Sequence, residues 1–207
     1  MGLFKRFLGQ TRKPEGFFGK LMLNAMNQGH AALSDWGLSH IEGLSPLVVA
    51  ELGCGGGRNA RELLRRYPMS KLYAVDYSPL AVCRTRAYNK PDIVKGRCRV
   101  LKASVQSLPL AASRFDLATA FETVYFWPDP AECFAEVYRI LKCGGSFLIC
   151  NESDGTDAEG LRYERIIDGM HCYTAEELET MLRTAGFSEV QVFRHKSKPW
   201  LTVLAKK

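Results

Sequence analysis

The sequence predicts a doubly wound α/β fold, with a mostly parallel seven-stranded sheet, helices on both faces and a Rossmann-like order of elements. Three observations predict it. Short apolar runs alternate with helical segments from residue 47 onward. The first run, 47–52, is apolar almost throughout, which is typical of a parallel strand buried on both faces. The last two expected strands, 189–194 and 200–205, are joined too tightly for a crossover helix, so we expect a C-terminal antiparallel hairpin.

Each element in the first half of the chain has its own start or stop signal. A helix over 58–66 carries its apolar side chains on one side and ends before Pro68. Ser78-Pro79 is an N-cap followed by proline at the first helical position. The expected elements after the first helix are a strand at 72–75, a helix from Pro79 to about residue 89, and strands at 97–101 and 115–121.

The second half continues the alternation. Asp129-Pro130 begins a helix in the same way, and Glu132 follows at the capping-box position. Thr174 and Glu177 form a second capping box. The expected elements are a helix that ends before Gly144, a strand at 146–151, a helix that ends at Gly186, and the two final strands.

The length and composition indicate one packed domain with an added segment. The chain has 207 residues, of which 46% are hydrophobic and 24% charged, so a core is expected and disorder is not. We assign residues 47–207 to the main, ligand-binding domain. Residues 1–46 precede the first strand and are expected to form a helical segment that acts as a lid over the active site. Its cationic, amphipathic beginning leaves a membrane-surface role as the alternative.

Charge and cysteine usage limit which partners and which cellular compartment are expected. The net charge of +6 is concentrated at the two ends, while the middle is mildly acidic, so neither nucleic acid nor a membrane is the expected partner. No apolar run reaches the roughly 18 residues that span a bilayer. The seven cysteines contain no Cys-x-x-Cys pair, which indicates reduced thiols in a cytoplasmic protein and no metal site.

A glycine-rich loop after the first strand is the clearest functional signal. It reads Glu51-x-Gly53-x-Gly55-x-Gly57, and Asp76 closes the second expected strand. Alternating glycines let a ligand approach the backbone, and the helix that follows presents free N–H groups. A carboxylate at the end of the second strand can accept hydrogen bonds from ribose hydroxyls. The spacing therefore predicts a nucleoside-containing ligand.

The loop does not fit the dinucleotide fingerprint. That pattern requires Gly-x-Gly-x-x-Gly or Ala, and the sixth position counted from Gly53 is Arg58. Counting from Gly55 brings Ala60 to the sixth position, but this frame starts three residues past the strand.

The frame from Glu51 to Gly57 resembles the first motif of class I S-adenosylmethionine-dependent methyltransferases. Further landmarks resemble the same family: Asp76, the stretch 103–110 that would flank the adenine, the fourth strand at 115–118, the Leu-Lys-Cys-Gly-Gly turn at 141–145, and the final hairpin. The resemblance covers 47–205 and implies S-adenosylmethionine as the cofactor.

The resemblance also implies a role for each matching residue. The cofactor-binding set would be Glu51, Gly53, Gly55, Gly57, Asp76, Tyr77, Ser104, Val105, Phe121 and Glu122. Asp76 would bind the ribose hydroxyls, Tyr77 would lie beside the adenine, and Ser104 and Val105 would lie at the adenine edge. The family often has Asp where Ser104 stands, and a hydroxyl accepts a hydrogen bond more weakly than a carboxylate. Phe121 and Glu122 would lie under the sulfonium.

The methyl acceptor is expected to be a small molecule. The fourth strand is followed by Glu122-Thr123-Val124-Tyr125 rather than the Asn/Asp-Pro-Pro-Tyr/Phe of enzymes that methylate adenine or glutamine amides. Candidate substrate contacts are Asn27, Tyr125, Trp127 and Asn151, and candidate catalytic residues are His30, Tyr125 and Glu152. Asn27 and His30 share one helix face, and His30 could act as a base. Asn151 and Glu152 end the fifth strand, at the sheet edge where α/β ligands bind.

Three functions remain open at the level of the sequence. The leading hypothesis is a methyltransferase that acts on a small molecule by in-line displacement, with oxygen, nitrogen, sulfur and arsenic all open as the acceptor atom. An NAD(P)-dependent oxidoreductase on the same type of sheet is an alternative. A non-catalytic module that binds RNA or a membrane surface through the basic termini is another.

Overall fold

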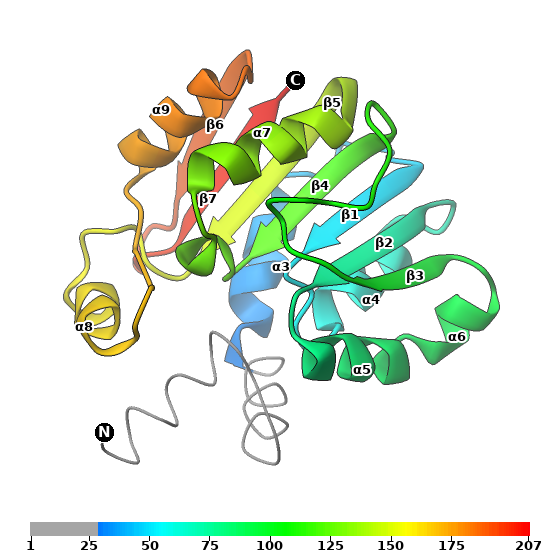
Figure 1. Ribbon diagram of the computed structural model, residues 1–207. Coiled ribbons are helices and arrows are strands. Elements are labelled where there is room, and N and C mark those ends of the chain that lie inside the picture. Colours follow the sequence, from blue (N-terminus) through cyan, green and yellow to red (C-terminus); the bar gives the residue numbers. More distant parts are fainter. Residues whose placement is uncertain (1–28) are drawn as a thin grey trace.

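The structure is a computed structural model that describes residues 29–207 (Figure 1). It contains one seven-stranded sheet with the strand order β3-β2-β1-β4-β5-β7-β6. The strands are β1 (Val48–Leu52), β2 (Lys71–Asp76), β3 (Cys98–Lys102), β4 (Phe115–Phe121), β5 (Leu141–Asn151), β6 (Glu189–Arg194) and β7 (Leu201–Lys206). The pairs among β1 to β5 are parallel, while β7 pairs antiparallel with both β5 and β6. The predicted fold class is confirmed.

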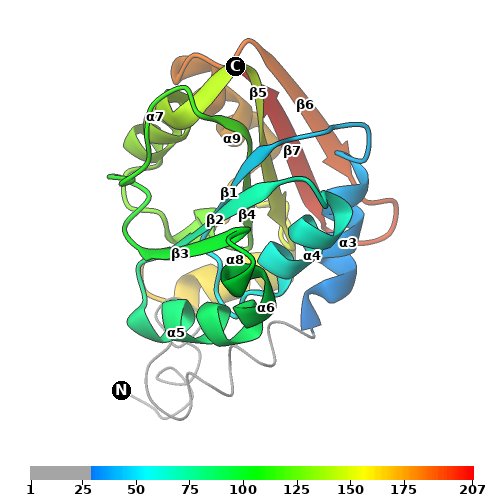
Figure 2. The ribbon, with the colours of Figure 1, turned by 90° about the vertical axis from the view of Figure 1, so that its right-hand side faces the viewer.

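Helices cover both faces of the sheet, as Figure 2 shows. One face carries α3 (Ala31–Ser39), α4 (Arg58–Arg66) and α5 (Pro79–Tyr88), whose apolar side chains join one buried cluster. The other face carries α7 (Pro130–Ile140) and α9 (Ala175–Thr184), which belong to a second cluster. The remaining elements are α6 (Lys90–Val94), the 3₁₀ turn η1 (Val124–Phe126) and α8 (Ala158–Ile166).

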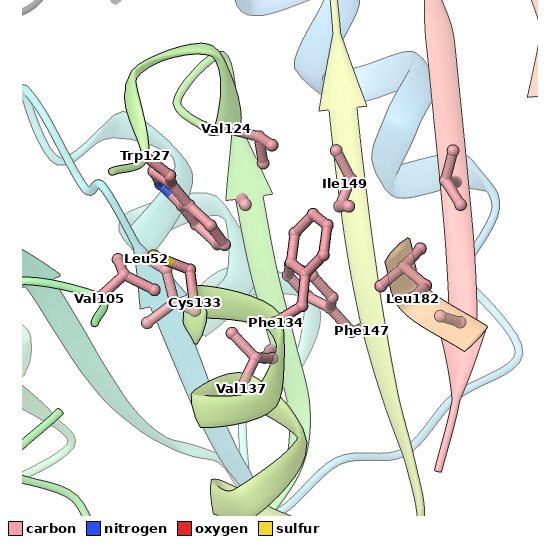
Figure 3. Close-up of a cluster of buried hydrophobic side chains, with 14 of the residues drawn as sticks. Leu52, Val105, Val124, Trp127, Cys133, Phe134, Val137, Phe147, Ile149 and Leu182 are labelled. Atoms are coloured by element: carbon pink, nitrogen blue, oxygen red, sulfur yellow. The ribbon is translucent and has the colours of Figure 1, made fainter. Parts of the chain in front are cut away.

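The second cluster fills the space between α7 and the centre of the sheet (Figure 3). Phe134 from α7 and Phe147 from β5 are fully buried and meet edge to face, with ring centroids 6.0 Å apart. Trp127 stacks on Phe147, with 6.1 Å between the ring centroids. Aromatic packing of this kind fixes the segment after β4 against the sheet.

One boundary differs by several residues from the sequence expectation. The helix ends at Ile140, before Gly144 as predicted, but β5 begins at Leu141 rather than at residue 146. Leu141 pairs with Phe115 of β4, with a register shift before Leu117, so strand pairing extends past the glycines. Two helices were not expected from the sequence: α6, which has only five residues, and α8, which begins at the N-cap Asp157, whose side chain accepts the N–H of Gly160.

The described part of the N-terminal segment lies against the sheet. Gly37 of α3 allows this close approach, because a Cβ there would lie 2.5 Å from the Cys150 sulfur and 3.3 Å from the Phe121 ring. Residues 1–28, and with them most of the expected lid, lie outside the described residues. In the range 29–207 the helices are all too short or too polar to cross a bilayer.

Candidate functional site

The candidate site lies where the order of the strands reverses in the sheet. β1 and β4 are neighbours, yet the chain continues from β1 outward to β2 and from β4 outward to β5. The connections therefore leave the carboxyl ends of β1 and β4 in opposite directions, and the space between them is the usual ligand crevice of such sheets. The glycine loop follows β1, and the segment from Glu122 follows β4.

The glycine loop requires glycine for two reasons: the conformation of its backbone and the closeness of neighbouring side chains. Gly53, Gly55 and Gly57 all have positive φ angles, of 80°, 49° and 85°. At Gly53 a Cβ would also lie 2.2 Å from the Thr123 hydroxyl oxygen. These positions combine a left-handed backbone with close packing, and glycine satisfies both.

Helix α5 and the end of β2 hold the loop in place. The Thr85 hydroxyl donates to the Gly55 carbonyl at 2.9 Å, and the Asn89 amide donates to the Gly57 carbonyl at 3.0 Å. The N–H of Gly55 donates to Asp76 Oδ2 at 2.9 Å. The loop is therefore fixed by side chains that lie 21 to 32 residues further along the chain.

Asp76 is a buried carboxylate with acceptor capacity to spare. Its Oδ1 accepts the N–H of Ser78 at 2.9 Å, and each oxygen has one backbone donor among these bonds. Burial raises the pKa of Asp76, and the backbone donors partly oppose that rise. A carboxylate has about four acceptor positions, and the backbone N–H groups of Gly55, Ser78 and Tyr77 bond to this one, so one position remains for a ribose hydroxyl.

Glu51 lies beneath the loop rather than in the pocket. It is 1% exposed, and its carboxyl group is hydrogen-bonded to the Thr119 hydroxyl of β4. Burial raises the pKa of Glu51 to about 8, and the hydrogen bond with Thr119 partly opposes this rise. The predicted cofactor-binding residue is thus a largely protonated group that joins β1 to β4.

A pocket opens between the loop and β4. It is lined by the glycine loop at 53–56, by Arg58 and Asn59 at the start of α4, by His30 and Ser34 from the N-terminal segment, and by Phe121 and Glu122. Arg58 is engaged by Asp35, with 2.7 Å between the two side chains. The structure thus brings His30 together with four of the predicted cofactor-binding positions: Gly53, Gly55, Phe121 and Glu122.

Glu122 has the most unusual setting in the pocket. Its φ of 57° lies in the left-handed region, which is uncommon for a residue with a side chain. Its Oε1 accepts the N–H of Glu152 and, at 3.1 Å, the Tyr125 hydroxyl. Burial raises the pKa of Glu122 to about 8; the charge of Glu152 adds to the rise, and the two hydrogen bonds oppose it.

His30 and Glu152 complete a polar cluster with Glu122. His30 Nε2 lies 3.5 Å from Glu152 Oε2. Burial lowers the pKa of His30, and the charge of Glu152 acts in the opposite direction. One ligand-type atom from each of the three residues lies within 4.8 Å of the others. The arrangement can accept and pass on a proton, because it combines an imidazole with two carboxyl groups.

Tyr125 and Trp127 are buried, although the sequence suggested that they contact the acceptor. Tyr125 is 3% exposed, and its hydroxyl accepts the N–H of Ser153 at 3.0 Å while it donates to Glu122. Trp127 is 7% exposed, and its Nε1 donates to the Thr123 hydroxyl at 3.2 Å. Tyr125 thus positions Glu122, and Trp127 packs the core.

The remaining predicted positions are spread around the site. Asn151 is fully buried at the end of β5, and neither polar atom of its side chain has a partner within the described residues. Tyr77 is 41% exposed next to Asp76. Ser104 is exposed and its hydroxyl accepts the N–H of Gln106 at 3.3 Å, whereas Val105 is buried in the core. Asn27 lies outside the described residues.

Sequence reasoning missed the residues that support the loop. Thr85 and Asn89 bind its carbonyls, and Thr123 lies against Gly53. Thr85 and Asn89 are four residues apart, so they share a face of one helix, and this polar pair on a buried face was the available signal. For Thr123 the sequence carries no comparable signal.

Comparisons with known proteins show which proteins this chain is similar to. A methyltransferase domain family matches residues 50–149. Together with the relatives and solved structures below, this match supports a class I S-adenosylmethionine-dependent methyltransferase family for the chain. An uncharacterized methyltransferase of Bacillus subtilis, YdaC, is 23% identical over 173 residues, which cover 84% of this chain and 89% of that protein. Cycloartenol-C-24-methyltransferase 1 of rice is 30% identical over 108 residues, which cover 52% of this chain and 31% of that protein.

Solved structures share the fold of this chain. A methyltransferase from Aquifex aeolicus superimposes with a TM-score of 0.74 at 18% identity, covering 89% of this chain and 96% of that one. Human N-acetylserotonin methyltransferase, solved with S-adenosylmethionine, gives 0.73 at 18% identity over 90% of this chain and 55% of that one. The chain spans 31% and 50% of the cycloartenol-C-24-methyltransferases of rice and Arabidopsis thaliana that it matches.

The site fits S-adenosylmethionine, the ligand with which the human N-acetylserotonin methyltransferase was solved. Asp76 offers a free acceptor position for a ribose hydroxyl, and Gly53, Gly55 and Gly56 offer backbone without side-chain bulk. In the same pocket, Glu122 offers a carboxyl group, which can be matched to a cationic sulfur.

Proposed function

We propose that this chain transfers the methyl group of S-adenosylmethionine to a small-molecule acceptor. The observation that carries the proposal is one pocket lined by two different kinds of residue. The glycine loop and the neighbouring Asp76 suit the cofactor, while His30 and Glu122 face the same space from outside that loop. The absence of an Asn/Asp-Pro-Pro-Tyr/Phe motif after β4 supports a small acceptor rather than a base or an amide.

The residues of the chain would act mainly by positioning. S-adenosylmethionine supplies an electrophilic methyl group, and transfer requires the acceptor atom, the methyl carbon and the sulfur to lie nearly in line. The loop, held by Thr85, Asn89 and Asp76, would fix the cofactor, and α3 would close the acceptor side through His30. His30, Glu122 and Glu152 together offer a place for the proton that the acceptor loses.

Isothermal titration calorimetry with S-adenosylmethionine and S-adenosylhomocysteine tests the proposal. Both ligands should bind the wild type, and Asp76→Asn should weaken both by roughly 10- to 100-fold, since a hydrogen bond to a charged group contributes about 1.5–3 kcal/mol. Asp92→Asn is the control, because this carboxylate pairs with Arg97 at 3.3 Å and does not line the pocket. Wild-type protein that binds neither ligand would refute the proposal.

A screen of metabolite extracts with methyl-labelled cofactor tests the acceptor class. The proposal expects the label in a compound of low molecular mass, found with wild type and reduced with Asp76→Asn. Label that appears only in protein, RNA or DNA would contradict a small-molecule acceptor.

A further inference from the structure

Glu122 carries a half-buried carboxyl group that the binding of the adenosine part leaves unexplained. It lines the pocket, it is held by two hydrogen bonds to Oε1, and its backbone is in the left-handed region. Non-glycine residues persist in that region when the surrounding structure enforces it, often at functional sites. The fold therefore holds one carboxyl group at the end of β4 against both a burial cost and a backbone cost.

The groups around Glu122 leave it without a cationic partner among residues 29–207. These groups are Cys150 from β5, Glu152 directly after β5, Tyr125 from η1, Cys172 from the segment before α9, and His30 at the N-cap of α3. The pKa of His30 is lowered, so its ring is largely neutral at neutral pH. Arg58 lines the same pocket, but its guanidinium is engaged by Asp35.

We propose that Glu122 distinguishes the cationic cofactor from its neutral product by its own ionisation: it loses a proton when S-adenosylmethionine binds and remains protonated when S-adenosylhomocysteine binds. The inference rests on the proposed function. The two ligands share the adenosine and the amino-acid part and differ at sulfur, which is a sulfonium in one and a thioether in the other. A positive charge in a pocket of low dielectric favours the carboxylate form of Glu122, and a thioether does not.

The proton balance closes over one turnover. Cofactor binding releases the Glu122 proton to solvent. In the transfer step the lone pair of the acceptor atom forms the new bond to the methyl carbon, and the electron pair of the breaking carbon–sulfur bond stays on sulfur. The acceptor proton then returns to Glu122, whose high proton affinity is restored once the sulfonium charge is gone. His30 can relay this proton, because its ring lies in the same cluster.

Calorimetry in buffers of different ionisation enthalpy, such as phosphate and Tris at pH 7.5, measures the released proton directly. With a pKa of about 8, Glu122 is protonated in about three-quarters of the molecules at this pH. On binding S-adenosylmethionine, wild type should release roughly 0.7 proton more than Glu122→Gln. On binding S-adenosylhomocysteine the two proteins should not differ. Comparing the proteins cancels any proton that a ligand's own amino group exchanges.

The pH dependence of affinity gives a second readout. Below pH 8, wild type must lose the Glu122 proton to bind S-adenosylmethionine, so affinity should rise by up to tenfold per pH unit and level off above pH 8. This slope should be absent for S-adenosylhomocysteine. In Glu122→Gln the slope for S-adenosylmethionine should also be lost.

Glu51→Gln is the matched control. Glu51 is buried and also has a pKa of about 8, but it is bonded to Thr119 and does not line the pocket. Glu51→Gln should retain the proton release of wild type, and this result excludes the other buried glutamate as the source of the proton. Release that is lost in Glu51→Gln, or that is equal in wild type and Glu122→Gln, would overturn the inference. Wild type that binds neither ligand would instead refute the proposed function.

Discussion

Replacing Gly53 by alanine separates two costs that the glycine loop avoids. The first is the left-handed backbone, at a φ of 80°. The second is a clash, since the new Cβ would lie 2.2 Å from the Thr123 hydroxyl oxygen, 2.6 Å from its Cβ and 2.9 Å from its methyl group. Rotation of Thr123 cannot relieve this, because the Thr123 Cβ is itself too close. We expect Gly53→Ala to lower both stability and cofactor affinity.

Gly144→Ala provides the matched comparison for the magnitude. Gly144 has a similar φ of 76°, but a Cβ there would meet nothing within 4 Å. It should cost only the backbone term of roughly 1–2 kcal/mol. Gly53→Ala adds overpacking of about 1–3 kcal/mol and should therefore cost about 2–5 kcal/mol.

Urea unfolding of both variants, with calorimetry of S-adenosylmethionine binding, measures the difference. Gly144→Ala should bind the cofactor like wild type, whereas Gly53→Ala should bind at least about tenfold more weakly, because the loop must shift away from Thr123. Equal destabilisation of the two variants would refute the argument from the clash. Unchanged affinity in Gly53→Ala would refute the role of this backbone in the site.

Two further predictions concern the sheet and the core. The Asp116 carboxylate accepts the N–H groups of Leu47 and Val48 and an N–H of Lys142; burial opposes its ionisation, but these bonds outweigh burial and lower its pKa. Its contribution to stability is therefore present above about pH 4 and lost at lower pH, so the melting temperature should fall less steeply on acidification in Asp116→Asn than in wild type. Trp127→Phe should cost about 1–3 kcal/mol in urea unfolding, because it leaves the Thr123 hydroxyl without its donor and creates a void beside Phe147; an unchanged midpoint would contradict a packing role.

The local signals in the sequence predicted the elements well. α4 begins and ends where the pattern placed it, at 58–66, and the capping box at Thr174 and Glu177 is present in the structure. These signals are reliable because caps, prolines and glycines act within a few residues. The start of β5 was predicted too late, since Leu141 pairs with Phe115 in a distant strand.

Part of the candidate site could likewise be predicted from the sequence, and part could not. The glycine loop and Asp76 could be predicted because their spacing along the chain reflects the geometry of one β-α-β unit. Tyr125 and Trp127 could not be placed, because an aromatic residue after a strand can face a ligand or the core, and the packing of α7 against β5 buries Trp127.

The sequence by itself thus determined the sheet, its antiparallel hairpin and the cofactor loop, all of which depend on short-range patterns. Only the tertiary structure decided which ionisable groups share the pocket. His30, Glu122 and Glu152 come from three segments that are far apart in sequence, and they meet because α3 packs beside the ends of β4 and β5. The burial that raises the pKa of Glu122 comes from the same packing, and a side chain's solvation depends on neighbours that its own sequence position does not specify.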